Sequence, residues 1–406
     1  MNAVETFRKD FEALDRAGGP LKAFRRAGWE KFKGLPTTQE EAYRFTNLQP
    51  LAQRSFALGR PSKNGIKSAP WIAPGLVFVD GHYRADLSKK PEGVEATCLA
   101  EALPHALEWV GAAGEGEPFV ALNAAFLEDG AFLRVKKGFR LPAPLHLLFL
   151  GTSKAAHPRN LYLIEEGAEA SIVETYLSLG EAPHLTNAVS DVRVARGASV
   201  EHYRLQLEGA SYHFGAVRAR LERDARFTSH NLACGGALTR NDITAALDGE
   251  GSRCTLNGLT LIRGTQHVDN YTRLEHRKPH CESHELYKGV LDDRASGVFT
   301  GRIHVFPDAQ KTDAYQASAN LLLTDTATVD AQPQLEIYAD DVKCSHGSTV
   351  GQLDKDALFY LRSRGLTEGA ARHVLVRAFA GDVADRLGIP AVRQRVDAIL
   401  EERLGG

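Results

Sequence analysis

Two segments of the chain concentrate side chains that bind metals. In the first segment, three histidines and one cysteine fall within nine residues: His276, His280, Cys281 and His284. Imidazole nitrogens and thiolates are common ligands of zinc and iron. Pro279 interrupts the helix that would align the three histidines. A metal site formed by His280, Cys281 and His284 and a polar, partly exposed corner of the fold are both open as interpretations of this segment.

On an extended strand, the ligands of this first segment would diverge. Side chains alternate between the two faces of a strand, so His280 and His284 would share one face and Cys281 would lie on the other. This segment alone is therefore not expected to place four ligands around one metal.

The second segment contains Cys344 and His346, preceded by Asp340 and Asp341. On a strand, Cys344 and His346 would point to the same side, close enough to hold one metal or one edge of a cluster. The two aspartates could orient an imidazole or add negative charge. Two ligands are too few for a tetrahedral site, so another subunit would have to complete it. The alternative is a buried thiol beside a hydrogen-bonded histidine.

The remaining cysteines and the common catalytic motifs offer no further site. Cys98, Cys234 and Cys254 have no His or Cys within three residues, and we interpret Cys234 and Cys254 as small core residues. The chain has no Gly-Lys dipeptide, and therefore no Walker A loop for a nucleotide triphosphate. It also lacks the GxSxG, HExxH and GxGxxG patterns. If ATP matters to its function, a partner is expected to supply that chemistry.

The composition narrows the class of protein. The 406 residues contain 49 Lys and Arg against 51 Asp and Glu, so the net charge of −2 gives no general attraction to nucleic acid. Mean hydropathy is −0.27, and no apolar run approaches the length of a membrane span. The first residues are charged and lack the apolar block of a secretory signal. Five cysteines, without a CxxC pair, predict reduced thiols. We expect a cytoplasmic protein of two or three domains.

Residues 131–350 must position the second segment, and their pattern favours a β-solenoid. Short apolar, β-branched runs alternate with small or turn-forming residues at Gly167, Gly197, Asp224 and Gly251, at intervals of 30, 27 and 27. Regular corners at this spacing are typical of stacked coils. A β-sandwich, which usually turns every 8–12 residues, is the less favoured alternative.

Helical regions are predicted on both sides of this core. Residues 1–130 are expected to be mainly helical, with a loop over 60–75 and a hairpin over 76–83 that turns at Asp-Gly. Residues 351–406 predict further helices, delimited by Gly365, Thr367 and Pro390. The predicted apolar stripe contains Ala371, Val374, Leu375, Ala378 and Phe379 in one helix and Val392, Val396, Ile399, Leu400 and Leu404 in the last. This stripe could cover the open end of the last coil or dock another protein; the two interpretations are compatible.

Several long stretches resemble the SufB/SufD family of iron–sulfur cluster assembly proteins. They are GRIHV from Gly301, DAQKTDAYQASANLLL from Asp308, PQLEIYADDVKCSHG from Pro333 and LFYLRSRG from Leu358. The similarity covers most of the chain and is densest over 269–380. One branch of the family places a functional cysteine directly after the glutamine that aligns with Gln316. This chain has Ala317 there, so it resembles the other branch.

The resemblance implies a fold and a function. The fold is a right-handed parallel β-helix flanked by helical regions. The function is that of a non-catalytic scaffold subunit, which pairs with SufB and with the ATPase SufC and itself binds no nucleotide. A transient iron–sulfur cluster or iron would be shared across the interface with SufB, where His346 is the expected ligand and Cys344 assists it or is structural. A homodimer of the isolated chain is also possible.

The C-terminal helical domain is implied to be the SufC docking region. The residues expected to contact the ATPase are Leu358, Phe359, Tyr360, Arg364 and Phe379. Two alternatives remain open. A β-helix polysaccharide lyase could use acidic groups such as Asp292-Asp293 with a basic side chain. A purely structural adaptor would use His346 only for packing.

Overall fold

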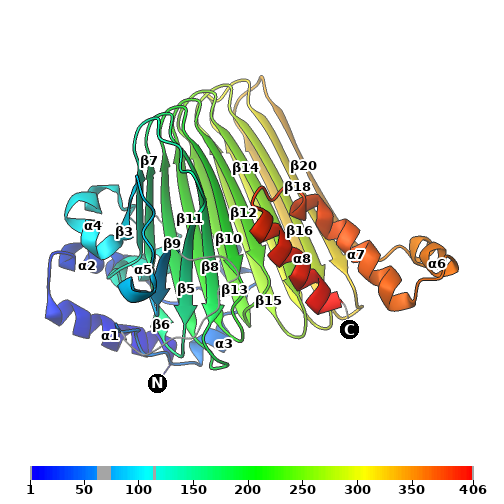
Figure 1. Ribbon diagram of the computed structural model, residues 1–406, viewed down its shortest axis with the longest axis horizontal. Coiled ribbons are helices and arrows are strands. Elements are labelled where there is room, and N and C mark those ends of the chain that lie inside the picture. The colour runs from blue at the N-terminus through cyan, green and yellow to red at the C-terminus, as the bar shows by residue number, and fades with distance from the viewer. Residues whose placement is uncertain (1, 62–74, 113–115, 405–406) are drawn as a thin grey trace.

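Parallel strands stack in this chain as the successive turns of a β-solenoid. The structure is a computed structural model that describes residues 2–61, 75–112 and 116–404. It is mainly β, with about eight turns and with helices before and after the strands (Figure 1). Most of the loop predicted over 60–75 lies outside the described residues. The solenoid predicted from the corner spacing is therefore confirmed.

The strands form two sheets, which face each other across the interior. Sheet I contains, in spatial order, β2 (His82–Tyr83), β1 (Leu76–Val79), β5 (Leu145–Gly151), β8 (Glu169–Ser178), β10 (Ser199–Gln206), β12 (Arg226–Ala233), β14 (Arg253–Ile262), β16 (Glu282–Leu291), β18 (Asp313–Leu322) and β20 (Lys343–Gln352). Sheet II contains β19 (Thr328–Ile337), β17 (Ser296–Val305), β15 (His267–His276), β13 (Leu238–Leu247), β11 (Tyr212–Leu221), β9 (Leu185–Val194), β7 (Arg159–Ile164), β4 (Ala131–Val135) and β3 (Glu95–Cys98), with β6 (Ala155–Ala156) paired to β9.

The repeat length follows from the pairing register. Ser199 is the partner of Arg226, which is the partner of Arg253, so one turn here takes 27 residues. The predicted corners at Gly167, Gly197 and Gly251 all have positive φ, and so does Asp224 with φ of 58°. Glycine and aspartate adopt this left-handed conformation at lower cost than other residues, which explains their recurrence where each turn bends.

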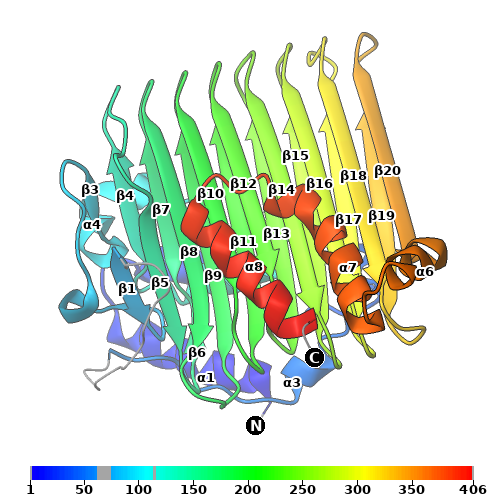
Figure 2. The ribbon, with the colours of Figure 1, turned by 45° about the vertical axis from the view of Figure 1, so that its right-hand side comes forward.

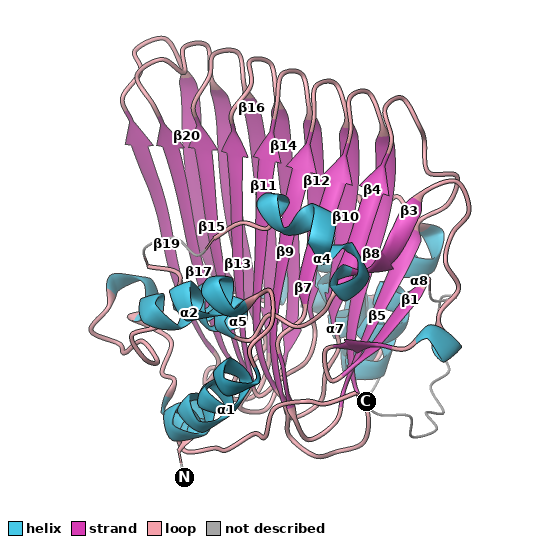
Figure 3. Ribbon diagram, turned by 90° about the vertical axis from the view of Figure 1, so that its left-hand side faces the viewer, coloured by secondary structure: helices cyan, strands magenta, loops and turns pink. Residues whose placement is uncertain are grey.

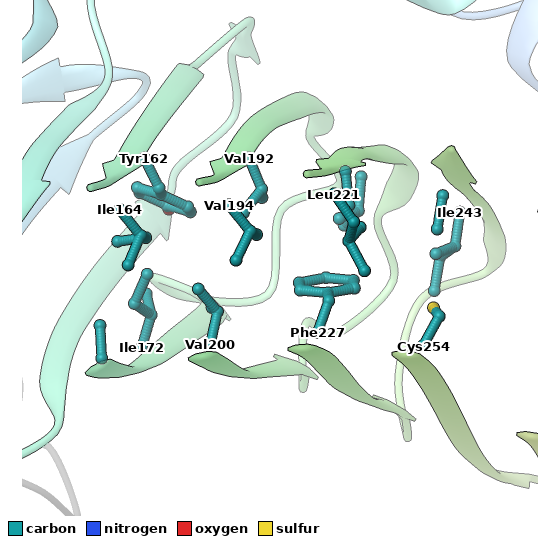
Figure 4. Close-up of a cluster of buried hydrophobic side chains, with 14 of the residues drawn as sticks. Tyr162, Ile164, Ile172, Val192, Val194, Val200, Leu221, Phe227, Ile243 and Cys254 are labelled. Carbon is teal, nitrogen blue, oxygen red and sulfur yellow. The ribbon is translucent and has the colours of Figure 1, made fainter. Parts of the chain in front are cut away.

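The interior of the solenoid is filled by apolar side chains from both sheets. Figure 4 shows Val192 and Leu221 from sheet II above Val200 and Phe227 from sheet I. Cys254 lies in the same cluster, fully buried, as predicted for a small core residue. Because inward positions recur every second residue along each strand, each turn adds one layer to a continuous core.

N-terminal helices cover the outer face of sheet II (Figure 3). They are α1 (Ala3–Ala17), α2 (Lys22–Lys31), η1 (Glu41–Tyr43), α3 (Gln49–Ala52), α4 (Leu99–Ala106), η3 (Leu107–Trp109) and α5 (Pro118–Ala125), with η2 (Ala85–Leu87) after the first hairpin. Phe7, Phe11 and Phe119 pack with Val189 and Phe214 of the sheet. The predicted hairpin is present: β1 and β2 pair antiparallel, and β1 also joins sheet I beside β5.

C-terminal helices cover the outer face of sheet I (Figure 2). The covering helices are α7 (Glu368–Ala384) and α8 (Pro390–Leu404), whereas α6 (Lys355–Ser363) precedes them and projects away from the solenoid (Figure 1). Val376, Ala380 and Val383 of α7 pack on this face, whereas the predicted stripe residue Val374 is 44% exposed. The helices therefore lie along the side of the solenoid, and the expectation that they cap its last coil was wrong. No described helix is both long and apolar enough to cross a bilayer.

Candidate functional site

The last turn of the solenoid is an open end. In sheet I, β20 has only β18 as a neighbour, and in sheet II, β19 has only β17, within the described part of the chain. We call the surface formed by β19, β20 and the turn between them the open end. Unpaired backbone groups along an edge strand can pair with another chain. Almost every residue of β20 is exposed, so this edge is free for such pairing.

Cys344 and His346 both lie on β20, at the open end. Cys344 is the register partner of Ala314, and His346 is the partner of Gln316; both partners are buried in the interior. Because they are two residues apart, the two side chains share the inner face of the strand, roughly 6.6 Å apart along it. Cys344 is half-buried and His346 is exposed. The predicted same-side arrangement is present, with the imidazole at the accessible position.

The thiol of Cys344 is held in its protonated form. Burial raises the pKa of Cys344, and the nearby carboxylate of Asp313 raises it further. A thiol in this state binds a metal only when the metal displaces its proton. Of the two side chains, His346 is therefore the more accessible to a metal.

Gln316 and Glu285 are buried polar residues that follow His346 in register on the two neighbouring strands β18 and β16. The sequence analysis did not single them out as a pair. Gln316 Nε2 donates a hydrogen bond of 2.5 Å to Glu285 Oε2, and Glu285 is the register partner of Gln316 on the neighbouring turn. Burial raises the pKa of Glu285 to about 7. Gln316 Oε1 has no hydrogen-bond partner in the described chain. The sequence signal that could have revealed this pair is a polar residue at an inward-facing position of each strand.

Asp341 makes its contacts with the preceding turn of the solenoid. Asp340 and Asp341 lie in the corner before β20, where the carboxylate of Asp341 forms an ion pair with Lys311. The Asp341 backbone N–H donates to Gln310 Oε1 at 3.0 Å. These contacts fasten the last corner to the preceding turn, so Asp341 has a structural role here.

Large apolar side chains surround the open end. Tyr315, Ile337, Tyr338 and Val350 are each at least 40% exposed, and Tyr338 reaches 61%. The ring of Tyr338 lies 5.2 Å from that of His304. Exposed apolar groups gathered at an unpaired edge are typical of a protein interface.

The first predicted cluster is dispersed by the strand geometry. Cys281 is fully buried, 3.3 Å from Ser252 Oγ, whereas His284 is exposed on the outer side of β16. His280 occupies an exposed corner with φ of 59°. His276 is buried and its Nε2 lies 2.8 Å from Ser283 Oγ. No three His, Cys, Asp or Glu side chains of the described residues form a group able to hold a metal ion.

Other predicted residues have clear positions. Ala317 is half-buried on β18, beside the inward-facing Gln316, and therefore points to the outer side. The predicted lyase residue Asp293 helps to build a corner, because its carboxylate accepts from the backbone N–H of Gly264 at 2.9 Å. Cys234 packs beneath the C-terminal helices. All five cysteines are free.

The residues predicted to dock an ATPase divide into two groups. Phe359 and Tyr360 of α6 are 73% and 57% exposed, and the helix projects away from the solenoid (Figure 1). Arg364 lies over the Tyr360 ring at 5.1 Å, and Leu358 is half-buried. Phe379 of α7 instead lies against sheet I.

The contacts of Phe379 are with Lys288 of β16. Lys288 Nζ is 4.3 Å from the centroid of the Phe379 ring and donates to the Phe379 carbonyl at 2.9 Å. Phe379 is therefore partly covered by contacts within the chain, whereas Phe359 and Tyr360 of α6 are exposed.

Comparison with known proteins gives a consistent family match. A family model described as SUF system FeS cluster assembly, SufBD core domain, matches residues 148–379. The chain is 36% identical over 388 residues to the iron–sulfur cluster assembly protein SufD of Escherichia coli, covering 92% of this chain and 90% of that protein. It is 31% identical over 389 residues to an iron–sulfur cluster assembly SufBD family protein of Synechocystis, covering 89% and 86%. SufD of Bacillus subtilis is 28% identical over 289 residues, covering 70% and 66%.

Proposed function

Since the chain belongs to the SufB/SufD family of iron–sulfur cluster assembly proteins, and to its SufD side, we propose that it is a scaffold subunit that pairs with SufB through the open end. The observation that carries this proposal is an uncapped solenoid end with His346 exposed on its inner face. An iron–sulfur cluster is the cargo, assembled at the interface and then released.

The ligand set at the open end supports a shared site. His346 and Cys344 supply at most two ligands, so the partner must provide the others for a four-coordinate iron. His346 binds the incoming iron through an imidazole nitrogen. The Cys344 thiol must lose its proton before it can bind the metal, and its raised pKa makes that loss less favourable than for an ordinary cysteine. A site with this composition binds iron only when both subunits are present, and it releases the iron when they separate.

The apolar rim supports the pairing itself. Tyr315, Ile337, Tyr338 and Val350 would be covered by the partner, while the unpaired strand β20 extends the sheet into the SufB chain. The isolated chain could instead cover this surface with a second copy of itself. We place the complex in the cytoplasm, in keeping with five free thiols.

The α6 helix is the proposed docking element for SufC. Its exposed Phe359 and Tyr360 provide apolar anchors, and Arg364 adds a positive charge beside them. ATP hydrolysis belongs to SufC in this proposal, because this chain has no Walker A loop. The ATPase would act on the scaffold by pulling on α6 and so straining the interface at the open end.

A ligand substitution tests the proposed role of the open end. The complex would be purified by co-expression with the SufB and SufC proteins of the same source, carrying wild-type chain, His346→Ala, Cys344→Ala or His105→Ala. His105 is an exposed histidine of α4, far from β20 in sequence, and is the matched control. Iron and acid-labile sulfide would be measured per complex.

We expect His346→Ala to lower iron and sulfide at least fivefold while subunit stoichiometry stays unchanged, and Cys344→Ala to lower them less. His105→Ala should equal wild type. Full iron and sulfide in an intact His346→Ala complex would reject the ligand role and favour a purely structural adaptor.

The docking element requires a separate test. Phe359→Ser should reduce the amount of SufC retained by the chain at least tenfold, because it removes a central apolar anchor. Lys355→Ala, at an exposed position of the same helix, is the control and should retain SufC. Equal retention by both variants would exclude Phe359 from the contact.

A further inference from the structure

A cavity lined by arginines lies on the outer face of sheet II, away from the open end. Its volume is about 350 Å³. Five arginines from β9, β11 and β15 and from the corner after β15 line it: Arg193, Arg218, Arg220, Arg273 and Arg277. We call this cavity the arginine groove. Figure 3 shows the face of sheet II that carries it, beside the helices α2 and α5.

Positive charge exceeds negative charge in the arginine groove. Among its described lining residues, three carboxylates oppose the five guanidinium groups: Glu117, Asp191 and Glu275. Asp191 is already shared with Arg159, a fully buried arginine beneath the groove, at 2.8 Å. Glu275 pairs with both Arg273 and Arg277, and Asp248 next to the groove pairs with Arg277 and Arg220. The carboxylates are therefore distributed over more cations than they can neutralise.

The strand register places two of these arginines side by side. Arg193 and Arg220 are direct partners on β9 and β11, so their backbones are roughly 4.8 Å apart. Like charges at directly opposed positions destabilise a sheet. Arg220 is compensated by Asp248 at 2.8 Å. Arg193 has no ion pair within the described residues, and its buried Nε has no hydrogen-bond partner there. Arg218 Nη1, on another lining arginine, is also buried without a hydrogen-bond partner among the described residues.

The unused donors indicate the chemistry of the missing partner. Guanidinium groups present planar, paired N–H donors that match the oxygens of a phosphate. The other lining side chains are small, such as Thr244 and Ala246, so the groove offers little apolar surface for an organic ring. A compact ligand with several negative oxygens fits this arrangement, and two linked phosphates would reach arginines on adjacent strands.

We propose that the arginine groove binds a ligand that carries a diphosphate group. A smaller adjoining cavity shares Glu117, Thr244 and Arg273 with the groove and is lined by aromatic residues that include Tyr271. The diphosphate can therefore be free pyrophosphate or part of a nucleotide whose ring enters that second cavity. The site is independent of the proposed cluster assembly, because it shares no residue with the open end.

Calorimetric titration of the full chain with sodium pyrophosphate tests the proposal. At low salt, we expect sub-millimolar binding that weakens as salt is added. Arg193→Gln should weaken it at least tenfold, and Arg220→Gln, at a more exposed position, should weaken it several-fold without affecting folding. Arg253→Gln, an exposed arginine of sheet I paired with Glu282, is the matched control and should change the affinity less than twofold.

Three results would overturn the proposal: no pyrophosphate binding by the wild-type chain, equal losses in Arg253→Gln and Arg193→Gln, or inorganic phosphate or citrate binding as tightly as pyrophosphate. Titration with ADP distinguishes the two sources. Tighter binding of ADP than of pyrophosphate assigns the groove to a nucleotide, and weaker binding assigns it to free pyrophosphate; both agree with a diphosphate site.

Discussion

At the scale of single residues, burial decides which protonation state Cys344 and Glu285 favour. Cys344 is half-buried near Asp313, and both effects favour the neutral thiol. Glu285 has no ion-pair partner among the described residues, so burial favours its neutral acid. His346 is exposed on the same inner face. Of these three side chains, the imidazole is therefore the accessible one, and the thiol and the buried acid both favour their neutral forms.

Cys344 should be the first cysteine of the native protein to react with iodoacetamide. It is half-buried, whereas Cys98, Cys234, Cys254 and Cys281 are buried. Asp313→Asn should increase its alkylation rate several-fold near pH 8, because removing the carboxylate lowers the pKa of the thiol. Peptide mass spectrometry over time measures both effects, with the denatured chain as the control in which all five cysteines react. Earlier labelling of a buried cysteine would contradict the prediction.

Glu285 should make the stability of the protein depend on pH. Its folded-state pKa of about 7 lies above its ordinary value of 4.5, so the unfolded chain loses this proton first as pH rises. The folded state is therefore favoured below about pH 4.5 and progressively loses stability up to about pH 7. Relative to Glu285→Gln, the wild type should lose roughly 3 kcal/mol over that window.

Denaturant unfolding at several pH values measures this difference. Glu181→Gln, at an exposed position, is the control and should follow the wild type. If the free energies of unfolding of the wild type and of Glu285→Gln change by the same amount between pH 4.5 and 7, then Glu285 is not buried as a neutral acid.

At the scale of elements, close contact between neighbouring turns depends on positions without a side chain. Gly258 of β14 lies directly opposite Tyr287 of β16. A Cβ at Gly258 would be 2.1 Å from the Tyr287 ring. The ring fills the space that the glycine leaves in the interior, so the two residues must be considered as one packing unit.

Gly258→Ala should lower the free energy of unfolding by about 1–3 kcal/mol, because the Tyr287 ring has to move within a densely packed core. Gly351→Ala, on the exposed strand β20 where an added Cβ meets no atom within 4 Å, should have little effect. Thermal unfolding of both variants measures the difference. Equal melting temperatures would indicate that the interior has room for the extra methyl group.

An element can be predicted from the sequence when its residue pattern is regular. Corner residues with positive φ repeat once per turn, so the solenoid could be predicted. The buried side of α8, with Val392, Val396 and Ile399, matched its helical spacing. The helix α7 carries apolar residues on several sides, and its buried stripe was misassigned to positions that include Val374. Only the sheet against which α7 packs determines which side is buried.

The same reasoning applies to the candidate site. Cys344 and His346 could be placed together because they are two residues apart on one strand. The pair of Gln316 and Glu285 could not, because it joins neighbouring turns 31 residues apart, and a one-residue change in register would turn one member outward. Contacts within a strand are encoded locally, whereas contacts between turns require the register.

At the scale of the whole molecule, the distribution of covered and uncovered surfaces suggests how the subunit functions. The N-terminal helices cover sheet II, the C-terminal helices cover sheet I, and the core lies between the sheets. The open end receives no helix within the described residues. Helices on both sides stabilise the solenoid laterally, so its end can remain unpaired without loss of the fold.

Tyr338→Glu should therefore separate pairing from folding. Tyr338 is 61% exposed at the open end, so a charge there costs the isolated chain little stability but would be buried on pairing with SufB. We expect at least a tenfold loss of SufB in co-purification and a melting temperature of the isolated chain within about 2 °C of wild type, as is usual for a surface substitution. Trp109→Glu, at a 46% exposed aromatic residue of η3, is the matched control and should retain SufB.

The two variants distinguish pairing by the open end from pairing by another surface. Retention of SufB by Tyr338→Glu and its loss from Trp109→Glu would assign the interface to the N-terminal helices over sheet II. In that arrangement, His346 would face solvent in the complex and could not share a cluster with the partner. The position of the interface therefore decides whether the ligands on β20 are used together with those of a second chain.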